Sequence, residues 1–147
     1  PGRRFKEAQS LKFHTSVTGV VLQQEVIAEF MRDGGYDHHM RKLRAAIRTQ
    51  AAQMIDAVTR YFPPGCKLSR PQGGYMLWIE LPRQVDSRKV FELARNEHIG
   101  LAPGATFSCS RRFDHFIRLH YGEPWSARLD ANLKRLGEII AGLAAQG

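Results

Sequence analysis

The stretch "SRPQGGYMLWIELP", residues 69–82, decides the fold, because within it the sequence changes from a helical period to a strand period. Alternate residues of a strand point to opposite faces. One face carries Tyr75, Leu77, Ile79 and Leu81, and the other carries Met76, Trp78 and Glu80. Large apolar side chains on both faces predict a central strand, which ends at Pro82. The "CKL" run at 66–68 predicts a second strand, joined to the first by a Pro-Gly-Gly turn.

Helical periods precede this pair of strands. Apolar residues at steps of three and four predict a long helix over residues 37–62, with Asp37 as its N-cap and the Pro-Pro-Gly run at 63–65 as its end. Two shorter helices are expected before it, and glycines end the second of them. The shorter helices cover 4–14 and 18–32, with a break at "TSVTG" (15–19) and an end at Gly34 and Gly35.

Four further elements follow the strand pair. They are a helix from Asp86 or Ser87 to about His98, a short strand at 99–102, a strand at 115–121 and a final helix that starts near Ser126. This order of elements predicts an α/β fold, a two-layer αβ sandwich in which a small mixed or antiparallel sheet is covered by helices mainly on one face. The 147 residues suffice for one domain with a hydrophobic core.

The composition argues against several classes of protein and site. No run approaches the roughly 18 apolar residues of a membrane span, so we expect no membrane segment. Cys66 and Cys109 form no CxxC pair, and the histidines form no HxxxH or HExxH pattern. We therefore expect neither a disulfide framework nor a metal site, and a reducing cytoplasm as the location.

An arginine stands in the middle of the strand "FIRLHY", residues 116–121. Alternation puts the aliphatic side chains on one face and Arg118 on the other, beside Phe116 and His120. If the aliphatic face packs on the helices, Arg118 points away from them. Two interpretations stay open at this point. The guanidinium binds a carboxylate of a ligand in a bidentate way, or it pairs with an acid of the sheet such as Glu80.

Other features of the sequence also allow two interpretations each. The net charge of +8 suits contact with nucleic acid, and it equally suits a domain separated from an acidic partner surface. The stripe of Arg41, Arg44 and Arg48 on the long helix is a solvated face or a phosphate contact. Gly73 and Gly74 form a turn that needs positive φ, or they let a ligand approach the backbone closely.

Three segments taken together resemble one family. "SRPQGGYMLWIELP" (69–82), "GLAPGATFS" (100–108) and "FIRLHYG" (116–122) occur in the order and spacing seen in the C-terminal small domain of fold-type I, pyridoxal-phosphate-dependent aminotransferases. The segments "YDHHMRKLR" (36–44) and "RYFPPGCKLSRPQGG" (60–74) resemble the MocR-like regulators of this family. In those regulators a GntR-type helix-turn-helix domain precedes an aminotransferase-like body. The 2-aminoadipate and aromatic aminotransferases are the alternative within the family.

The resemblance implies a ligand site. Arg118 matches the family arginine that binds the α-carboxylate of the substrate, while Gly74 and Tyr75 match a segment that approaches the substrate side chain. Pro103 and Gly104 match a loop at the rim of the active site. The implied cofactor is pyridoxal 5'-phosphate (PLP), and the implied ligand is an amino acid or a 2-oxo acid. The full-length protein is expected to be a homodimer, and a regulator would bind DNA through a separate N-terminal domain.

The resemblance also implies that this chain is incomplete. Lys6, Lys12, Lys42, Lys67, Lys89 and Lys134 do not stand in the family's lysine motif, so we expect no catalytic residue here and no activity of the chain alone. The opening "PGRR" without an initiator Met suggests a piece of a longer protein. We expect residues 1–32 to be a helical segment that leads from a large domain, and residues 33–147 to be the small domain.

Three functional hypotheses follow. In a metabolic transaminase, Arg118 would hold the carboxylate so that the Cα–H bond stands across the plane of the PLP ring. In a transcription factor, the same arginine would anchor an amino-acid effector, and closure of the small domain would signal to the DNA-binding domain. In the third hypothesis, the chain is a free-standing basic module that binds nucleic acid through its long helix.

Overall fold

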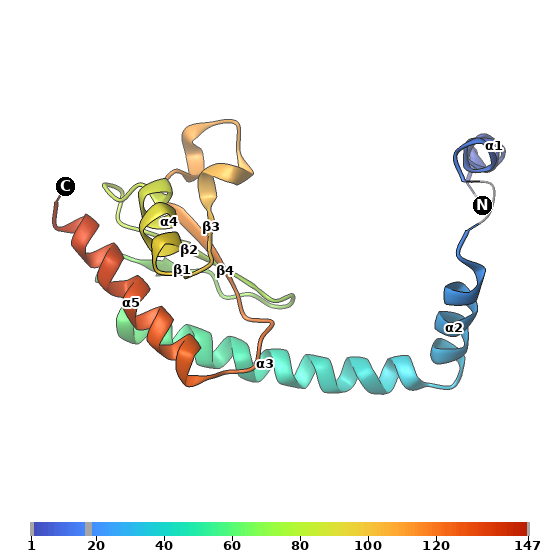
Figure 1. Cartoon of the computed structure of the whole chain (residues 1–147), viewed down its shortest axis with the longest axis horizontal. Coiled ribbons are helices and arrows are strands. Elements are labelled where there is room, and N and C mark those ends of the chain that lie inside the picture. The colour runs from blue at the N-terminus through green and yellow to red at the C-terminus, as the bar shows by residue number, and fades with distance from the viewer. Residues whose placement is uncertain (1, 17–18, 147) are drawn as a thin grey trace. The chain divides into compact units, whose positions relative to one another are not determined.

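A four-stranded antiparallel sheet organises residues 44–147 of the computed structural model, which describes residues 2–16 and 19–146 (Figure 1). The strands lie in the order β1-β2-β4-β3, with β2 and β4 in the centre. Their bounds are β1 Lys67–Leu68, β2 Met76–Glu80, β3 Ala102–Pro103 and β4 Phe116–His120. The three strand pairs are all antiparallel. The predicted central strand is therefore confirmed, and the sheet is antiparallel rather than mixed.

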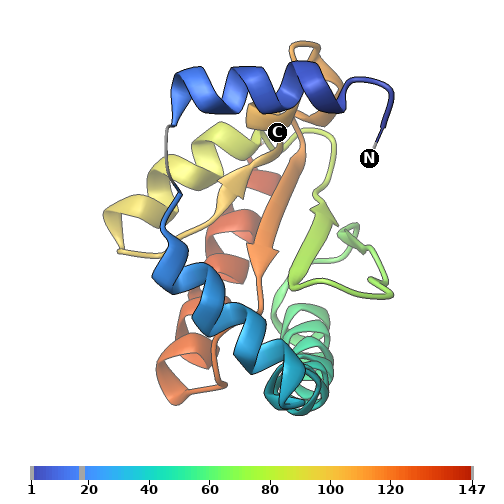
Figure 2. The same ribbon diagram turned by 90° about the vertical axis from the view of Figure 1, so that its right-hand side faces the viewer.

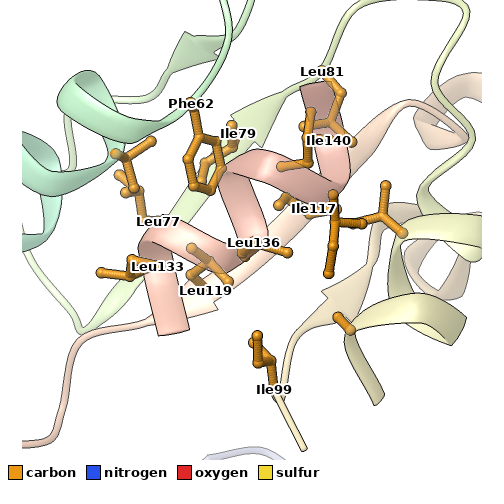
Figure 3. Close-up of a cluster of buried hydrophobic side chains, with 14 of the residues drawn as sticks. Phe62, Leu77, Ile79, Leu81, Ile99, Ile117, Leu119, Leu133, Leu136 and Ile140 are labelled. Carbon is orange, nitrogen blue, oxygen red and sulfur yellow. The ribbon is translucent and has the colours of Figure 1, made fainter. Parts of the chain in front are cut away.

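Helices cover one face of this sheet. They are the C-terminal half of α3 (Gly35–Tyr61), together with α4 (Ser87–Asn96) and α5 (Ala127–Ala144). Figure 2 shows α5 behind the sheet, and Figure 3 shows its apolar side chains against those of β2 and β4. The buried side chains of this layer include Leu77, Ile79, Ile117, Leu119, Leu133, Leu136 and Ile140. The predicted two-layer sandwich with helices mainly on one face is confirmed.

Local signals in the sequence explain where several elements begin. The Asp86 carboxylate accepts a hydrogen bond from the backbone N–H of Arg88 at 2.8 Å and caps α4. The Ser126 hydroxyl accepts from the N–H of Leu129 at 3.2 Å and caps α5. Gly74 has φ +75°, so the turn before β2 needs glycine there. This agrees with the interpretation of Gly73 and Gly74 as a turn that needs positive φ.

Two predicted boundaries are wrong. The helix expected from Asp37 begins at Gly35, because Gly34 turns the chain with φ +81° and the Asp33 carboxylate accepts from the Gly35 N–H at 2.8 Å. Asp37 thus lies inside the first turn. The strand expected at 99–102 is reduced to Ala102–Pro103. The N–H of Ile99 instead donates to the carbonyl of Ala94 and closes the end of α4.

Residues 1–43 form a separate compact unit. It contains α1 (Phe5–Thr15), α2 (Val21–Arg32) and the beginning of α3. None of the residues of α1 and α2 is buried. Residues 17 and 18, which belong to the expected break and to the start of the expected second helix, lie outside the described residues. The linking role of residues 1–32 stays a prediction. Within the part of the chain that the structure covers, no helix has both the length and the apolar character to cross a membrane.

A close helix crossing fixes α5 against the end of α3. Gly137 is buried, and a Cβ atom added to it would lie 2.8 Å from the carbonyl carbon of Tyr61 and closer still to its oxygen. The Tyr61 hydroxyl also donates a hydrogen bond to the Asp130 carboxylate at 2.8 Å. Since backbone cannot yield as a flexible side chain can, this position requires glycine.

We expect Gly137→Ala to lower the free energy of unfolding by about 1–3 kcal/mol, because the added methyl group overpacks a backbone contact. Gly142→Ala in the same helix is the matched control, since nothing lies within 4 Å of its Cβ position. There the gain in helix propensity should stabilise the protein by about 0.5–1 kcal/mol. Urea denaturation of both variants measures the difference, and equal stability of the two would contradict the close crossing.

Candidate functional site

Arg118 lies on the face of the sheet opposite the helices. Its strand neighbours Ile117 and Leu119 are buried in the core, whereas Arg118 is half-buried on the other face. Trp78 on β2 is its direct cross-strand partner. The guanidinium carbon lies 4.1 Å from the centroid of the Phe107 ring. The predicted direction of this side chain, away from the helices, agrees with this geometry.

The internal ion pair considered for Arg118 is not formed. Glu80 lies opposite Phe116 rather than Arg118. Its carboxylate is 3.5 Å from the ammonium of Lys67 and 3.8 Å from Nε2 of His115. Among residues 2–16 and 19–146, no carboxylate lies within the 4.0 Å of an ion pair with Arg118. The guanidinium therefore keeps its hydrogen-bond donors for another acceptor.

Four aromatic rings lie in contact with one another on the face of Arg118 and form what we call the aromatic cluster, made of Trp78, Phe107, Phe113 and Phe116; of these, Phe107 contacts the guanidinium. Trp78 is its centre, with ring centroids at 5.4 Å from Phe107, 5.6 Å from Phe113 and 6.0 Å from Phe116. Phe113 and Phe116 also meet edge to face at 5.4 Å. Such edge-to-face contacts are favourable because the positive ring edge meets the negative ring face.

Two short 3₁₀ helices carry two rings of this cluster, Phe107 and Phe113, while Trp78 and Phe116 lie on strands. The two helices are η1 (Gly104–Phe107) and η2 (Arg111–Phe113), which join β3 to β4. Gly104 is buried, and a Cβ atom there would lie 2.7 Å from Cβ of Phe116 and 2.8 Å from its carbonyl oxygen. The absence of a side chain at Gly104 thus lets η1 lie directly on β4. As a result, Phe107 reaches the guanidinium of Arg118.

Asp114 links the segment between β3 and β4, which contains η1 and η2, to α4. Its carboxylate accepts hydrogen bonds from Nε of Arg111 at 2.9 Å and from Nη2 of Arg88 at 3.3 Å. Its backbone carbonyl accepts from the N–H of Ser87 at 2.8 Å. The Arg111 guanidinium, followed by that of Arg88, lowers the pKa of the Asp114 carboxyl below its usual range. The side chain is 16% exposed, so these bonds are partly shielded from water.

The other predicted site residues lie at the far end of β2. Gly74 and Tyr75 precede the strand, and the Tyr75 carbonyl accepts from the N–H of Tyr121 at 2.9 Å. The Tyr75 side chain is 51% exposed. In the described ranges, no hydrogen bond or ring contact joins Tyr75 to Arg118. The structure therefore brings Arg118 together with the Pro103 and Gly104 segment, and it leaves Gly74 and Tyr75 as predictions.

Sequence reasoning did not predict that the rings of Phe107 and Phe113 belong to the aromatic cluster, or that Phe107 contacts Arg118. Phe107 lies in the segment "GLAPGATFS" (100–108), from which the sequence predicted a loop at Pro103 and Gly104 but no role for the Phe107 ring. Phe113 lies in a three-residue helix that has no detectable period. The alternation of β4 did identify Phe116 as a neighbour of Arg118 on one face.

The described residues do not themselves suggest a cofactor site. Lys89 and Lys134 lie on α4 and α5, on the opposite side of the sheet from Arg118, and Lys67 faces Glu80. Across residues 2–16 and 19–146, no group of three or more His, Cys, Asp or Glu side chains could hold a metal ion. Burial raises the pKa of the Cys66 thiol to about 11, so this group stays protonated at neutral pH.

Comparisons with known proteins agree with this architecture. The chain is 32% identical over 140 residues to YjiR, an uncharacterized HTH-type transcriptional regulator of Escherichia coli K12, with 95% of this chain and 30% of the relative covered. It is 27% identical over 137 residues to the 2-aminoadipate transaminase of Thermus thermophilus, with 93% and 33% covered. No protein-family model matches the chain.

The crystal structure of Pyrococcus horikoshii kynurenine aminotransferase matches the fold with a TM-score of 0.84 at 26% identity, over 93% of this chain and 34% of that one. The chain therefore has the fold of the small domain of PLP-dependent aminotransferases. Its relatives include HTH-type transcriptional regulators as well as a 2-aminoadipate transaminase and an aromatic-amino-acid aminotransferase. The chain spans about a third of the length of the curated relatives it matches.

We expect Asp114→Asn to reduce stability at pH 7, because the neutral amide loses the charge-assisted bonds from Arg111 and Arg88. A lowered pKa means that the carboxylate stabilises the fold above its unfolded pKa of about 3.9 and loses this effect as the pH falls through the folded pKa. The difference between wild type and variant should therefore shrink on acidification.

Denaturation midpoints between pH 7 and pH 3 measure this effect. Asp56→Asn is the control, because the ion pair of Asp56 with Arg60 lies on an exposed helix surface, with side chains 66% and 58% exposed. Exposed pairs contribute little. If the difference in denaturation midpoint between wild type and Asp114→Asn did not change with pH, the charge of Asp114 would not stabilise the segment between β3 and β4.

Proposed function

We propose that this chain is the C-terminal small domain of a PLP-dependent, aminotransferase-like protein, in which Arg118 binds the carboxylate of an amino-acid or 2-oxo-acid ligand. The observation that carries the proposal is the position of Arg118. Its guanidinium lies on the face of the sheet opposite the helices, against Phe107, with no carboxylate of the described residues in ion-pair range. A planar guanidinium in such a place suits bidentate recognition of a carboxylate.

The chemistry of Arg118 in this role is orientation. Two parallel N–H···O bonds fix both the position and the plane of a carboxylate. The bonds at the α-carbon are then held at a defined angle to whatever group reacts with them. The aromatic cluster beside Arg118 offers apolar surface and excludes water from part of this face, which strengthens a charge-assisted hydrogen bond.

PLP, when bound, supplies an electron sink for the bond changes at the α-carbon. The structure of the kynurenine aminotransferase contains PMP, pyridoxamine 5'-phosphate, which is the amino form of PLP. This match supports PLP as the cofactor of the proposed full-length protein. The lysines of residues 44–147 do not lie beside Arg118, so we propose that other parts of a longer polypeptide contribute the groups that hold PLP. This chain would then supply the carboxylate-binding side of the site.

A regulatory function is the form of this proposal that we favour. Two of the matched relatives, YdcR and YjiR of Escherichia coli, are HTH-type transcriptional regulators, at 28% and 32% identity. The match to a 2-aminoadipate transaminase, at 27% identity, supports a metabolic enzyme as the alternative. Sequence-specific DNA binding by the full-length polypeptide that changes on addition of an amino acid would support the regulator. Turnover without DNA binding would support the enzyme.

In the full-length polypeptide, we expect Arg118→Lys to weaken amino-acid binding by about ten- to hundredfold while PLP stays bound. Lysine keeps the charge and loses the planar fork, so the bidentate bond is lost. Titration of the PLP absorbance with amino acids measures the affinity. Arg95→Lys is the matched control, since Arg95 lies over Phe91 on α4, away from the proposed site. Equal affinity in wild type and Arg118→Lys would remove Arg118 from the site.

We also expect the isolated 147-residue chain neither to develop a stable Schiff-base absorbance with added PLP nor to transaminate amino acids. The reason is that none of its lysines stands in the family's lysine motif. Absorbance spectra after gel filtration test this expectation, with the full-length polypeptide as the positive control. A stable yellow complex of the isolated chain would contradict the proposed division of the site.

A further inference from the structure

The contact between Arg118 and Phe107 differs from the other arginine–aromatic contacts among the residues that the structure describes. Its distance of 4.1 Å from guanidinium carbon to ring centroid is shorter than the 5.3 Å of Arg112 over Phe113, the 5.5 Å of Arg60 over Tyr61 and the 5.9 Å of Arg95 over Phe91. Those three pairs join residues of one element or direct neighbours in the sequence. Arg118 and Phe107 come from different elements, β4 and η1. Their contact therefore depends on the tertiary fold.

Phe107 is itself held from behind. Its ring meets Trp78 edge to face, with centroids 5.4 Å apart and planes at 73°. Trp78 lies on β2 directly opposite Arg118 on β4. The pairing of these two strands therefore fixes how far Trp78, which supports Phe107, lies from Arg118. The buried Gly104 brings the start of η1 to within contact distance of Phe116 on β4. The Phe107 ring is thus held by the Trp78 ring on β2 and by the close approach of η1 to β4 at Gly104. Any larger residue at position 104 would displace η1.

We propose that Phe107 is a positioning residue, which holds the guanidinium of Arg118 in place for the carboxylate of the ligand. The inference rests on the proposed function and adds a residue to it. A ring against the flat face of a guanidinium attracts the cation and leaves the N–H donors, which lie in the guanidinium plane, free for a carboxylate. A long arginine side chain otherwise has large rotational freedom, which it loses on binding. Phe107 removes part of that loss before the ligand arrives.

The test compares Phe107→Leu with Phe107→Tyr in the full-length polypeptide with PLP bound. The probes are the 2-methyl derivatives of alanine, leucine, phenylalanine, glutamate and 2-aminoadipate, which have no α-hydrogen to lose. The second probe is the corresponding amine, which has the same side chain as the amino acid but lacks the carboxylate. Dissociation constants come from the change in PLP absorbance. Phe107→Leu should weaken binding of the tightest amino-acid probe by about two- to fivefold. Phe107→Tyr, which keeps the ring, should bind as wild type does.

Two further comparisons separate positioning from a general structural effect. Binding of the carboxylate-free amine should be the same in all variants, because it does not use Arg118. In an Arg118→Ala background, Phe107→Leu should cause no additional loss, since the two residues act as a unit. Phe91→Leu, which removes the analogous ring beside Arg95 on α4, should leave every dissociation constant unchanged. If Phe107→Leu does not fold, Phe107→Met replaces it, because Met fills a similar space without a ring.

The outcomes distinguish this inference from the proposed function. If Arg118→Ala weakens binding and Phe107→Leu does not, Phe107 has no positioning role and the proposed function stands. An equal loss for the amino acid and for the carboxylate-free amine would likewise overturn the positioning role. If Arg118→Ala binds the probes as wild type does, or if no probe binds, the proposed function falls and the inference falls with it.

Discussion

The antiparallel pairing of β2 with β4 is the constraint on which the rest of residues 44–147 depends. It places Leu77 opposite Leu119 and Ile79 opposite Ile117, and all four side chains are at most 5% exposed. A shift of one residue would turn this set to the outer face and bring Trp78 and Arg118 toward the helices. Because the core strongly opposes such a shift, the position of Arg118 on the outer face follows from burial of its neighbours. The site is therefore a consequence of the hydrophobic core.

A second packing layer forms on the outer face. The aromatic cluster joins β2, η1, η2 and β4 there, and the bonds of Asp114 connect the same region to α4 on the inner face. Glycine at position 104 makes this layer possible, since any side chain would push η1 away from β4. The outer face is thus partly covered, and Arg118 on it is half-buried. A short connection that would otherwise be flexible becomes part of the wall of the site.

Sequence reasoning predicts the regular elements of this protein well, and it fails where tertiary contacts decide. The central strand, a helix start at Asp86 or Ser87, the start of the last helix near Ser126 and the outward direction of Arg118 follow from period, capping chemistry and alternation. The N-cap at Asp37 is wrong, because the positive φ of Gly34 and the carboxylate of Asp33 start the helix two residues earlier. Phe107 has no local signal, since a four-residue 3₁₀ helix has no period and its partner lies on another element. Gly74 and Tyr75 stay predictions from resemblance.

The regulator and the enzyme place the same physical demand on this chain. Arg118 is fixed by Phe107, and Phe107 is fixed by Trp78 and by the connection that Asp114 anchors to α4. If Arg118 binds a carboxylate as proposed, the ligand is then held by the packed unit of residues 44–147 and not by one side chain alone. On the proposed function, a ligand bound in this way restrains the whole unit. That restraint orients the ligand for chemistry in an enzyme, and it supplies a change of domain position that a DNA-binding domain can detect in a regulator.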